Sequence, residues 1–166
     1  MLRLVLPHEK EEVYKMEYKE WDSNLPFSSY IKEYEKDDER GERFVYITDQ
    51  GTIASSLMLY RLPLLSKKLQ APVYGIAFVM TKPKHRKKGY AKKMIQSCLS
   101  SIQTKEKDAL ILLHSEVNPA FYEQFHFRAL PYHLQQDPEV VSMIISSDEQ
   151  FEQVSHLHIK DIPLYF

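Results

Sequence analysis

Cysteine and glycine are scarce in this 166-residue sequence, which holds one cysteine and four glycines. Because Cys98 is alone, an intrachain disulfide is excluded, and with it the class of small disulfide-stapled folds. The glycines form neither the G-x-x-x-x-G-K-[ST] pattern of P-loop nucleotide hydrolases nor the G-x-G-x-x-G pattern of Rossmann folds. The sequence therefore supports neither of these two nucleotide-binding classes.

The sequence also lacks an excess of charge and a long apolar run. Lys and Arg number 22 and Asp and Glu 23, a formal net charge of -1, so nothing global favours binding to nucleic acid or to a membrane surface. The apolar part of M-L-R-L-V-L-P-H-E-K is too short for a signal peptide or a membrane span, which favours a cytoplasmic protein. The 7 histidines, including H-L-H at 156–158, show no metal-ligand spacing, so we expect no metal.

Hydrophobic periodicity predicts a mixture of strands and helices in one globular domain over residues 1–166. Patterns typical of strands lie at 2–7, in two runs within 43–64 divided by D-Q-G, and at 73–81, 109–115, 128–134 and 139–147. Patterns typical of helices lie at 8–22, 27–41, 118–127 and from Gly89 through Ile102. Ser28 or Ser29 is the expected cap of the second helix and Gly41 its end. Residues 148–166 have weak helical periodicity and form a tail of uncertain role.

The clearest signal is the helix that follows Gly89. An apolar stripe runs along it at i, i+3, i+4, i+7, i+8 and i+11, made by Ala91, Met94, Ile95, Cys98, Leu99 and Ile102. The helix is therefore expected to pack on a sheet. With the buried strands before and after it, it forms a β-loop-α-β unit whose crossover should be right-handed and whose strands should be parallel.

A basic run, H-R-K-K-G-Y-A-K-K, leads into this helix. The first amides of a helix have no internal partner and its dipole is positive at that end, so a helix start favours an anion such as a pyrophosphate. Gly89 and Ala91 keep side-chain bulk away from such an anion, and Arg86, Lys87 and Lys88 add positive charge. A solvated basic loop is the simpler interpretation. Nucleic-acid binding is disfavoured because the run is short and only Tyr90 could stack on a base.

These residues resemble a known family, the GNAT acetyltransferases. R-K-K-G-Y-A matches the R/Q-x-x-G-x-G/A signature of that family, T-K-P-K-H-R resembles the segment that precedes it, and F-Y-E-Q-F-H-F resembles F-Y-E-x-x-G-F. The similarity extends from about residue 73 to residue 127. It implies an α/β (α+β) fold with a mixed, mostly antiparallel twisted sheet around a central parallel β-loop-α-β unit that binds acetyl-CoA.

The resemblance also implies roles for individual residues. The backbone of Val79, Met80 and Thr81 would lie along the acetyl-pantetheine arm. The pyrophosphate of coenzyme A would be wrapped by Arg86, Lys87, Lys88, Gly89, Tyr90 and Ala91. Tyr122 would be the general acid that protonates the departing thiolate, and Asn118 would be a further cofactor ligand. A core tyrosine without a catalytic role is the simpler interpretation of Tyr122.

Two local features qualify the match. His126 occupies the place of a family glycine, at a position that tends to need a positive φ. The segment H-S-E-V-N-P-A-F-Y resembles the shorter form seen in Eis-type acetyltransferases. Within it, Glu116 or His114 could act as a base or orient an amine through water, although a polar residue at a strand end is more often merely satisfied.

The function implied is an acetyl-CoA-dependent N-acetyltransferase that acts by direct attack of a primary amine on the thioester. The acceptor would be a small-molecule or peptide amine, and the protein a monomer or homodimer. A CoA-binding regulatory module of the same fold is the alternative. The acidic run at 33–42 would be either a solvated helix face or an attraction for a cationic acceptor, and Cys98 an inert packing residue.

Overall fold

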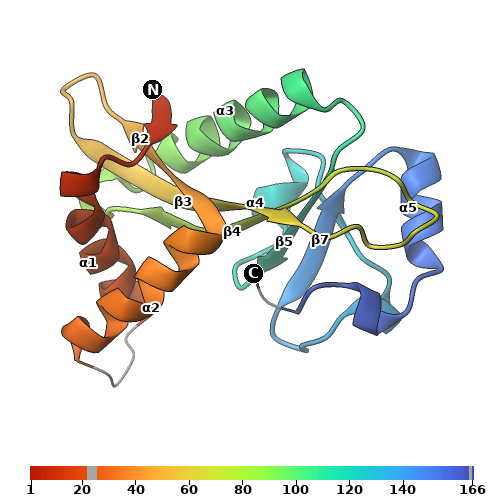
Figure 1. Ribbon diagram of the computed structural model, residues 1–166. Coiled ribbons are helices and arrows are strands. Elements are labelled where there is room, and N and C mark those ends of the chain that lie inside the picture. The colour runs from red at the N-terminus through yellow and green to blue at the C-terminus, as the bar shows by residue number, and fades with distance from the viewer. Residues whose placement is uncertain (22–25, 165) are drawn as a thin grey trace. The chain divides into compact units, whose positions relative to one another are not determined.

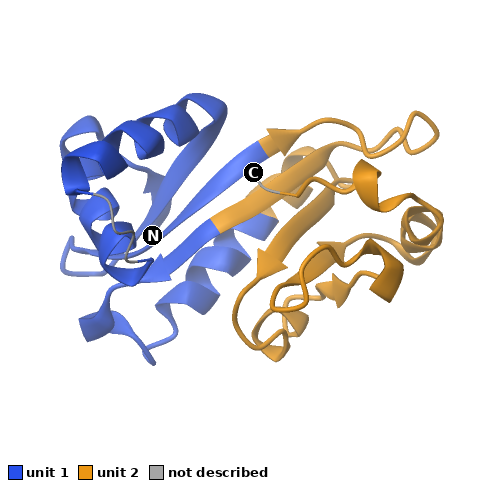
Figure 2. Ribbon diagram, turned by 90° about the horizontal axis from the view of Figure 1, so that it is seen from below, with its two compact units in different colours: residues 1–60, 78–99 blue, residues 61–77, 100–166 orange. Residues whose placement is uncertain are grey.

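The computed structural model describes residues 1–21, 26–164 and 166. Two compact units divide the chain, one of residues 1–60 and 78–99 and the other of residues 61–77 and 100–166 (Figure 2). The sheet has seven strands in the order β1-β2-β3-β4-β5-β7-β6. Strand β4 pairs with β5 in parallel, whereas β1 with β2, β2 with β3, β5 with β7 and β6 with β7 are antiparallel pairs. The predicted mixed, mostly antiparallel sheet is therefore confirmed.

The first unit contains the N-terminal strands and helices, together with the parts of β3, β4 and α3 that fall within its residues. Its strands are β1 (Leu2–Leu4), β2 (Gly41–Ile47), β3 (Ile53–Leu62) and β4 (Val73–Thr81). Its helices are α1 (Lys10–Glu20), α2 (Phe27–Arg40) and the start of α3 (Tyr90–Lys105). Figure 1 shows α1 and α2 together on one face of these strands and α3 on the other.

Side chains of β2 alternate between these two faces, as the pleat of a strand requires. Val45 and Ile47 are buried in a cluster with Val13 of α1. On the opposite face Tyr46 lies against Tyr90, the first residue of α3, with ring centroids 6.1 Å apart. The strand thus joins the two helical layers of this unit.

Two sequence-based boundaries of this unit need correction, and a third is confirmed. The first strand ends at Leu4 rather than at residue 7, because Pro7 already begins a short 3₁₀ helix. Neither Ser28 nor Ser29 caps α2, whose N-cap is Pro26. The predicted end of the second helix at Gly41 is confirmed: Gly41 is the C-cap of α2, in an extended conformation. Gly41 also begins β2, where a Cβ would lie 2.8 Å from the Tyr60 ring. Asp22, at the end of the predicted first helix, lies outside the described residues.

The apolar stripe of α3 is confirmed at five of its six positions. Met94, Ile95, Cys98, Leu99 and Ile102 are buried, and the first residue of the stripe, Ala91, is half-buried. Burial, and to a lesser degree the charge of Glu42, raises the pKa of the Cys98 thiol to about 12. A thiol with that pKa is protonated at neutral pH, as expected for an inert packing residue.

The second unit is built on β5 (Leu110–Ser115) and β7 (Val141–Ile145). Val73–Gly75 of β4 pair in parallel with Leu110–Leu112 of β5, which confirms the predicted parallel pair. On its other side β5 pairs with β7 in antiparallel fashion, and β7 pairs with the two-residue strand β6 (Arg128–Ala129). The predicted strand at 128–134 is therefore mostly wrong, because Tyr132–Leu134 form a 3₁₀ turn after Pro131.

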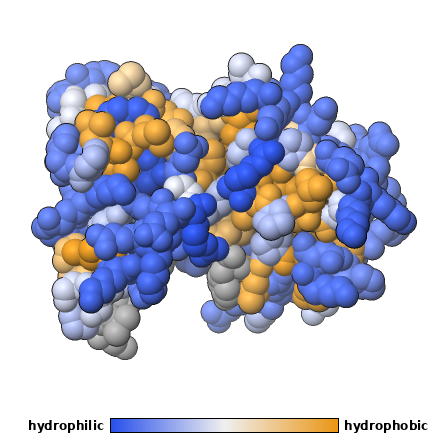
Figure 3. Space-filling view, in the orientation of Figure 1, coloured by the Kyte–Doolittle hydropathy of each residue, from blue (hydrophilic) through white to orange (hydrophobic). Residues whose placement is uncertain are grey.

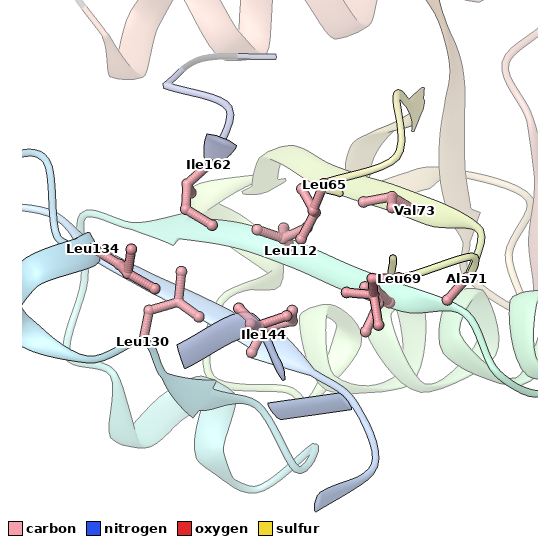
Figure 4. Close-up of a cluster of buried hydrophobic side chains, with 11 residues drawn as sticks. Leu65, Leu69, Ala71, Val73, Leu112, Leu130, Leu134, Ile144 and Ile162 are labelled. Carbon is pink, nitrogen blue, oxygen red and sulfur yellow. The ribbon is translucent and has the colours of Figure 1, made fainter. Parts of the chain in front are cut away.

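The described residues of the predicted tail, 148–164 and 166, contribute to the core of this unit. Helix α5 (Asp148–Ser155) begins with a capping box, in which Gln150 N–H donates to Ser147 Oγ (3.2 Å) and Ser147 N–H donates to Gln150 Oε1 (2.9 Å). Val154 of α5 is buried with residues of the sheet. Ile162, beyond the helix, is buried in the same cluster (Figure 4). The H-L-H motif lies at the end of α5 and in the turn after it.

Candidate functional site

The basic run forms a tight turn between β4 and α3. A 3₁₀ helix, Pro83–His85, follows the strand, and the backbone then takes positive φ at Lys87 (60°) and again at Gly89 (78°). The amide of Lys93 donates to the Gly89 carbonyl at 3.0 Å, so Gly89 is the residue from which α3 starts. The amides of the first helical turn have no partner inside the helix. They point out of the helix start, beside the two left-handed residues of the turn.

The space at Gly89 is open. Apart from its two chain neighbours, no atom of the described residues would lie within 4 Å of a Cβ built on this glycine. Arg86, Lys87 and Lys88 around it are all exposed and place three positive charges beside the turn. A diphosphate group fits this combination of free amides, open space and positive charge.

Two acidic residues of α1 hold the basic side chains of this turn. Arg86 Nη2 lies 2.6 Å from Glu20 Oε2, and Arg86 Nε donates to the Thr81 carbonyl at 3.0 Å. Lys82 Nζ is paired with Glu12. The turn is therefore tied both to the end of β4 and to α1.

Residues 79–81 form the end of β4. Val79 is half-buried, Met80 is buried, and Thr81 Oγ1 shares a hydrogen bond of 2.8 Å with Ser55 Oγ of β3. Immediately before them Phe78 has a φ of 50°, which is unusual for a non-glycine residue in a strand. Thus the three residues that the family resemblance assigns to the pantetheine arm follow a backbone irregularity.

Tyr122 lies on α4 (Ala120–Glu123) in the second unit, and its side chain is largely buried. Its ring packs edge-on against Phe121, with centroids 5.0 Å apart, and against Phe127 at 6.0 Å. Burial, and secondly the charge of Glu116, raises the pKa of Tyr122 to about 12. The phenol is therefore fully protonated at neutral pH.

The other residues of this segment have different surroundings. Glu116 and Asn118 are exposed, and Asn118 Oδ1 accepts a hydrogen bond from the Ala120 amide at 3.0 Å. His114 Nδ1 lies 2.9 Å from Ser142 Oγ, and His114 Nε2 lies 2.9 Å from the Pro163 carbonyl oxygen. Because both ring nitrogens of His114 are engaged, its geometry is that of a satisfied strand residue rather than of a base.

His126 adopts the conformation that the family glycine would adopt. Its φ is 70°, and its side chain is exposed. The expectation of a positive φ at this position is confirmed. The chain therefore keeps the backbone turn after α4 with a residue that is less suited to it.

The sequence-predicted site residues divide between the two units. The first unit holds residues 79–81 and 86–91, and the second holds Glu116, Asn118 and Tyr122. Sequence reasoning missed a buried charged group in the first unit that contacts Phe78. This group contains Arg43 of β2, Glu17 of α1 and Asp38 of α2.

No cluster of three or more His, Cys, Asp or Glu residues in the described part of the chain is arranged to hold a metal ion. Over the same residues no helix is both long enough and apolar enough to cross a bilayer.

The surface of α2 is hydrophilic in Figure 3, and Glu33, Glu35 and Glu39 are exposed on it. This is the arrangement expected of a solvated acidic face.

Residues 4–130 match the family model described as acetyltransferase (GNAT) domain, which covers more than half of the chain. Among curated proteins no match was found.

Solved structures share this fold at low sequence identity. A GNAT family N-acetyltransferase from Escherichia coli, in complex with CoA, is 16% identical, with a TM-score of 0.66 over 95% of this chain and 86% of that chain. Spermidine N-acetyltransferase from Vibrio cholerae, in complex with CoA and spermine, is 18% identical, with a TM-score of 0.68 over 92% and 97%. A probable N-acyltransferase from Enterococcus faecalis is 17% identical, with a TM-score of 0.67, and this chain spans 32% of its length.

Proposed function

The chain belongs to the GNAT acetyltransferase family, and we propose that it transfers the acetyl group of acetyl-CoA to a primary amine. The observation that carries this proposal is the turn at residues 86–91. Its left-handed Gly89 opens a helix of 16 residues, and the space beside that glycine is open. We assign the pyrophosphate of CoA to this turn and the acetyl-pantetheine arm to the backbone of Val79, Met80 and Thr81.

The transfer itself would be direct. The amine nitrogen attacks the thioester carbonyl, a C–N bond forms, and the C–S bond then breaks with its electron pair left on sulfur. Backbone amides would stabilise the negative charge on the carbonyl oxygen in the tetrahedral intermediate. The proton lost by the amine goes to a base through water, and Glu116 is the candidate on this chain.

Tyr122 is assigned the role of general acid toward the leaving sulfur. Its pKa of about 12 keeps the phenol protonated at neutral pH, which a proton donor requires. The thiol that is formed has a pKa of about 8.5, so complete transfer of the tyrosine proton to the thiolate is uphill. We therefore expect Tyr122 to act mainly by donating a hydrogen bond to the sulfur as charge develops there.

The acceptor is inferred to be a small-molecule amine, with a peptide amine as the other possibility. The structures that share the fold include a spermidine acetyltransferase and a glucosamine-6-phosphate N-acetyltransferase from Arabidopsis thaliana. The exposed carboxylates of α2 would raise the local concentration of a cationic acceptor. The resemblance of Ser115–Glu116 and Tyr122 to Eis-type enzymes stays a prediction.

Calorimetric titration with acetyl-CoA, CoA and ADP tests the cofactor assignment. Gly89→Asp adds a carboxylate and a Cβ at the assigned pyrophosphate position, and we expect it to abolish binding of all three. Gly51→Asp is a matched control, since Gly51 also has a positive φ (75°) and open space around a Cβ but lies in the β2–β3 hairpin. Wild-type protein that binds none of the three would remove the proposal, and equal loss in both variants would remove the assignment to the turn.

Release of the CoA thiol in the presence of an amine panel tests turnover. Tyr122→Phe should lower kcat by roughly 10²- to 10³-fold, the usual cost of removing one hydrogen-bond donor to a developing negative charge. The Kd for CoA should remain within about twofold, and Tyr132→Phe, which changes an exposed tyrosine, should leave both values unchanged. Tight CoA binding without turnover on any amine would favour the alternative of a CoA-binding regulatory module.

A further inference from the structure

Phe78 is held in a conformation that its own chemistry disfavours. Its φ of 50° lies in the left-handed region, where the Cβ of any residue except glycine crowds the following carbonyl oxygen. A residue keeps such a conformation only where its surroundings impose it. The contacts of the Phe78 ring are therefore the expected cause of its positive φ.

Residues of three elements of the first unit contact the Phe78 ring. Trp21, at the end of α1, meets it edge-on with centroids 5.9 Å apart, and Tyr34 of α2 meets it edge-on at 6.0 Å. The guanidinium carbon of Arg43, on β2, lies 5.7 Å from the centroid of the Phe78 ring. Arg43 lies at similar distances from Tyr14 (5.3 Å) and Tyr34 (5.5 Å), so three aromatic rings surround one cation.

Arg43 is in turn held by the carboxyl groups of Glu17 and Asp38, and burial raises the pKa of Glu17 to about 7. The Arg43 side chain is 1% exposed, and its Nη1 and Nε lie 2.6 Å from Glu17 Oε1 and Asp38 Oδ1 respectively. Asp38 also accepts hydrogen bonds from Tyr14 (2.6 Å) and Lys10 (2.8 Å). These bonds lower the pKa of Asp38 although burial opposes them, so this partner of Arg43 is a carboxylate at neutral pH.

This charged group is poorly arranged for stability alone. Among the described residues, Arg43 Nη2 and Glu17 Oε2 are buried without a hydrogen-bond partner. A buried ion pair of this kind is weak evidence for stability, because the loss of hydration offsets the attraction between the charges. A role in fixing the position of neighbouring side chains accounts better for the presence of this charged group. The neighbour that matters here is the Phe78 ring, which Arg43 contacts.

We propose that Arg43 is a positioning residue, which acts through the Phe78 ring to hold the backbone of residues 78–81 in the form that receives acetyl-CoA. The proposal rests on the proposed function, which assigns Val79, Met80 and Thr81 to the acetyl-pantetheine arm. At the other end of this segment the Thr81 carbonyl accepts from Arg86 and the Thr81 hydroxyl meets Ser55. The segment is thus anchored by side chains at both ends.

Two variants of one residue separate the ring from the backbone. Phe78→Ala and Phe78→Gly both delete the ring, but only glycine adopts a φ of 50° without strain. We expect Phe78→Ala to weaken acetyl-CoA binding by tenfold or more in calorimetry, because alanine relaxes to a negative φ. Phe78→Gly should stay within threefold of the wild type, measured at a temperature where both variants are folded.

A double-variant cycle then tests Arg43. Arg43→Lys keeps the positive charge but loses the planar face and the fixed fork of donors. It should weaken acetyl-CoA binding at least fivefold in the wild type and less than twofold in Phe78→Gly, where no ring is left to hold. A purely structural role would lower Tm in both backgrounds and leave the Kd at lower temperature unchanged.

The outcomes distinguish this inference from the proposed function. Wild-type protein that fails to bind acetyl-CoA removes the proposed function and this inference with it. Wild-type binding together with equal losses in Phe78→Ala and Phe78→Gly overturns the inference and leaves the proposed function standing. If Arg43→Lys does not fold, the two Phe78 variants alone decide whether the strained backbone is what must be held.

Discussion

Arg86 of the turn before α3 and Glu20 at the end of α1 are joined by an ion pair of 2.6 Å. Each side chain is nearly half exposed, at 44% and 45%. Such a pair is worth at most about 1 kcal/mol and weakens with salt. Arg86 is also one of the residues assigned to the pyrophosphate, so the carboxylate and the phosphate would compete for one guanidinium.

Glu20→Gln should therefore tighten CoA binding. Freeing Arg86 from a pair of this strength should lower the Kd for CoA by roughly two- to fivefold at low salt, and by less at high salt. Glu11→Gln is the control, because Glu11 is an exposed carboxylate of the same helix that pairs with Lys15 rather than with the turn. An equal gain in both variants would mean that only overall charge had changed.

His126 offers a test of backbone strain at an exposed position. Its φ of 70° suits glycine better than histidine, so His126→Gly should be more stable than His126→Ala by about 1 kcal/mol. Both variants lose the same exposed ring, and chemical denaturation of the two gives the difference directly. Equal stability would show that the turn relaxes at no cost when alanine is present.

His114 should make stability depend on pH. Burial lowers the pKa of His114, although the hydrogen bond to the Pro163 carbonyl opposes this effect. The unfolded state then binds a proton more readily than the folded state, so the free energy of unfolding should fall as pH drops below about 6.5.

His114→Gln should reduce that fall. The pKa of His85 is also lowered, so His85→Gln measures the share of the second histidine in the same titration. Urea denaturation at several pH values between 5 and 8 gives the slopes. A slope that is identical in wild type and His114→Gln would contradict the assignment.

Gly75 and Phe166 pack so closely that a methyl group would not fit between them. A Cβ at Gly75 would overlap the Phe166 ring and would lie 3.0 Å from Leu62 Cδ1. Gly75→Ala should therefore lower the free energy of unfolding by about 1–3 kcal/mol, the usual cost of overpacking.

The double variant Gly75→Ala/Phe166→Ala tests where that cost arises. If the Phe166 ring causes the strain, Gly75→Ala should cost much less in the Phe166→Ala background than in the wild type. Phe166→Ala alone is the reference for the packing lost with the ring, which also lies 5.0 Å from His114 between centroids. A cost of Gly75→Ala that is the same in both backgrounds would place the strain at Leu62.

The sequence predicted best where local pattern and tertiary packing agree. The stripe from Met94 to Ile102 has helical spacing, and all of it faces the core, so the start and the buried face of α3 were both predictable. The parallel pair followed from the strand-helix-strand order. The turn at Gly89 was predictable because few residues adopt a positive φ at a helix start.

Structure was harder to predict from the sequence where the apolar pattern was weak, or where a charged residue is buried among apolar ones. The capping box at Ser147 and Gln150 was available and would have located α5, although the apolar pattern after it is weak. Arg43 lies on the same face of β2 as Val45 and Ile47, so the buried face of this strand carries a charge. Because a pattern of apolar residues ignores a buried cation, its partners Glu17 and Asp38 could be found only in three dimensions.

Because the single cysteine of the sequence is buried, its chemical modification can report local unfolding of the protein. Cys98 sits in the stripe of α3 with 2% of its surface exposed, so a thiol reagent can modify it only when that helix lifts from its neighbours or the chain unfolds. The modification rate therefore reports how often this happens. Thiol-detecting dyes would meanwhile see released CoA against almost no background from the folded protein. If CoA binds at the start of α3, it stabilises the folded form of this helix and should slow the labelling of Cys98. The labelling rate would then report both occupancy of the turn and local opening of α3.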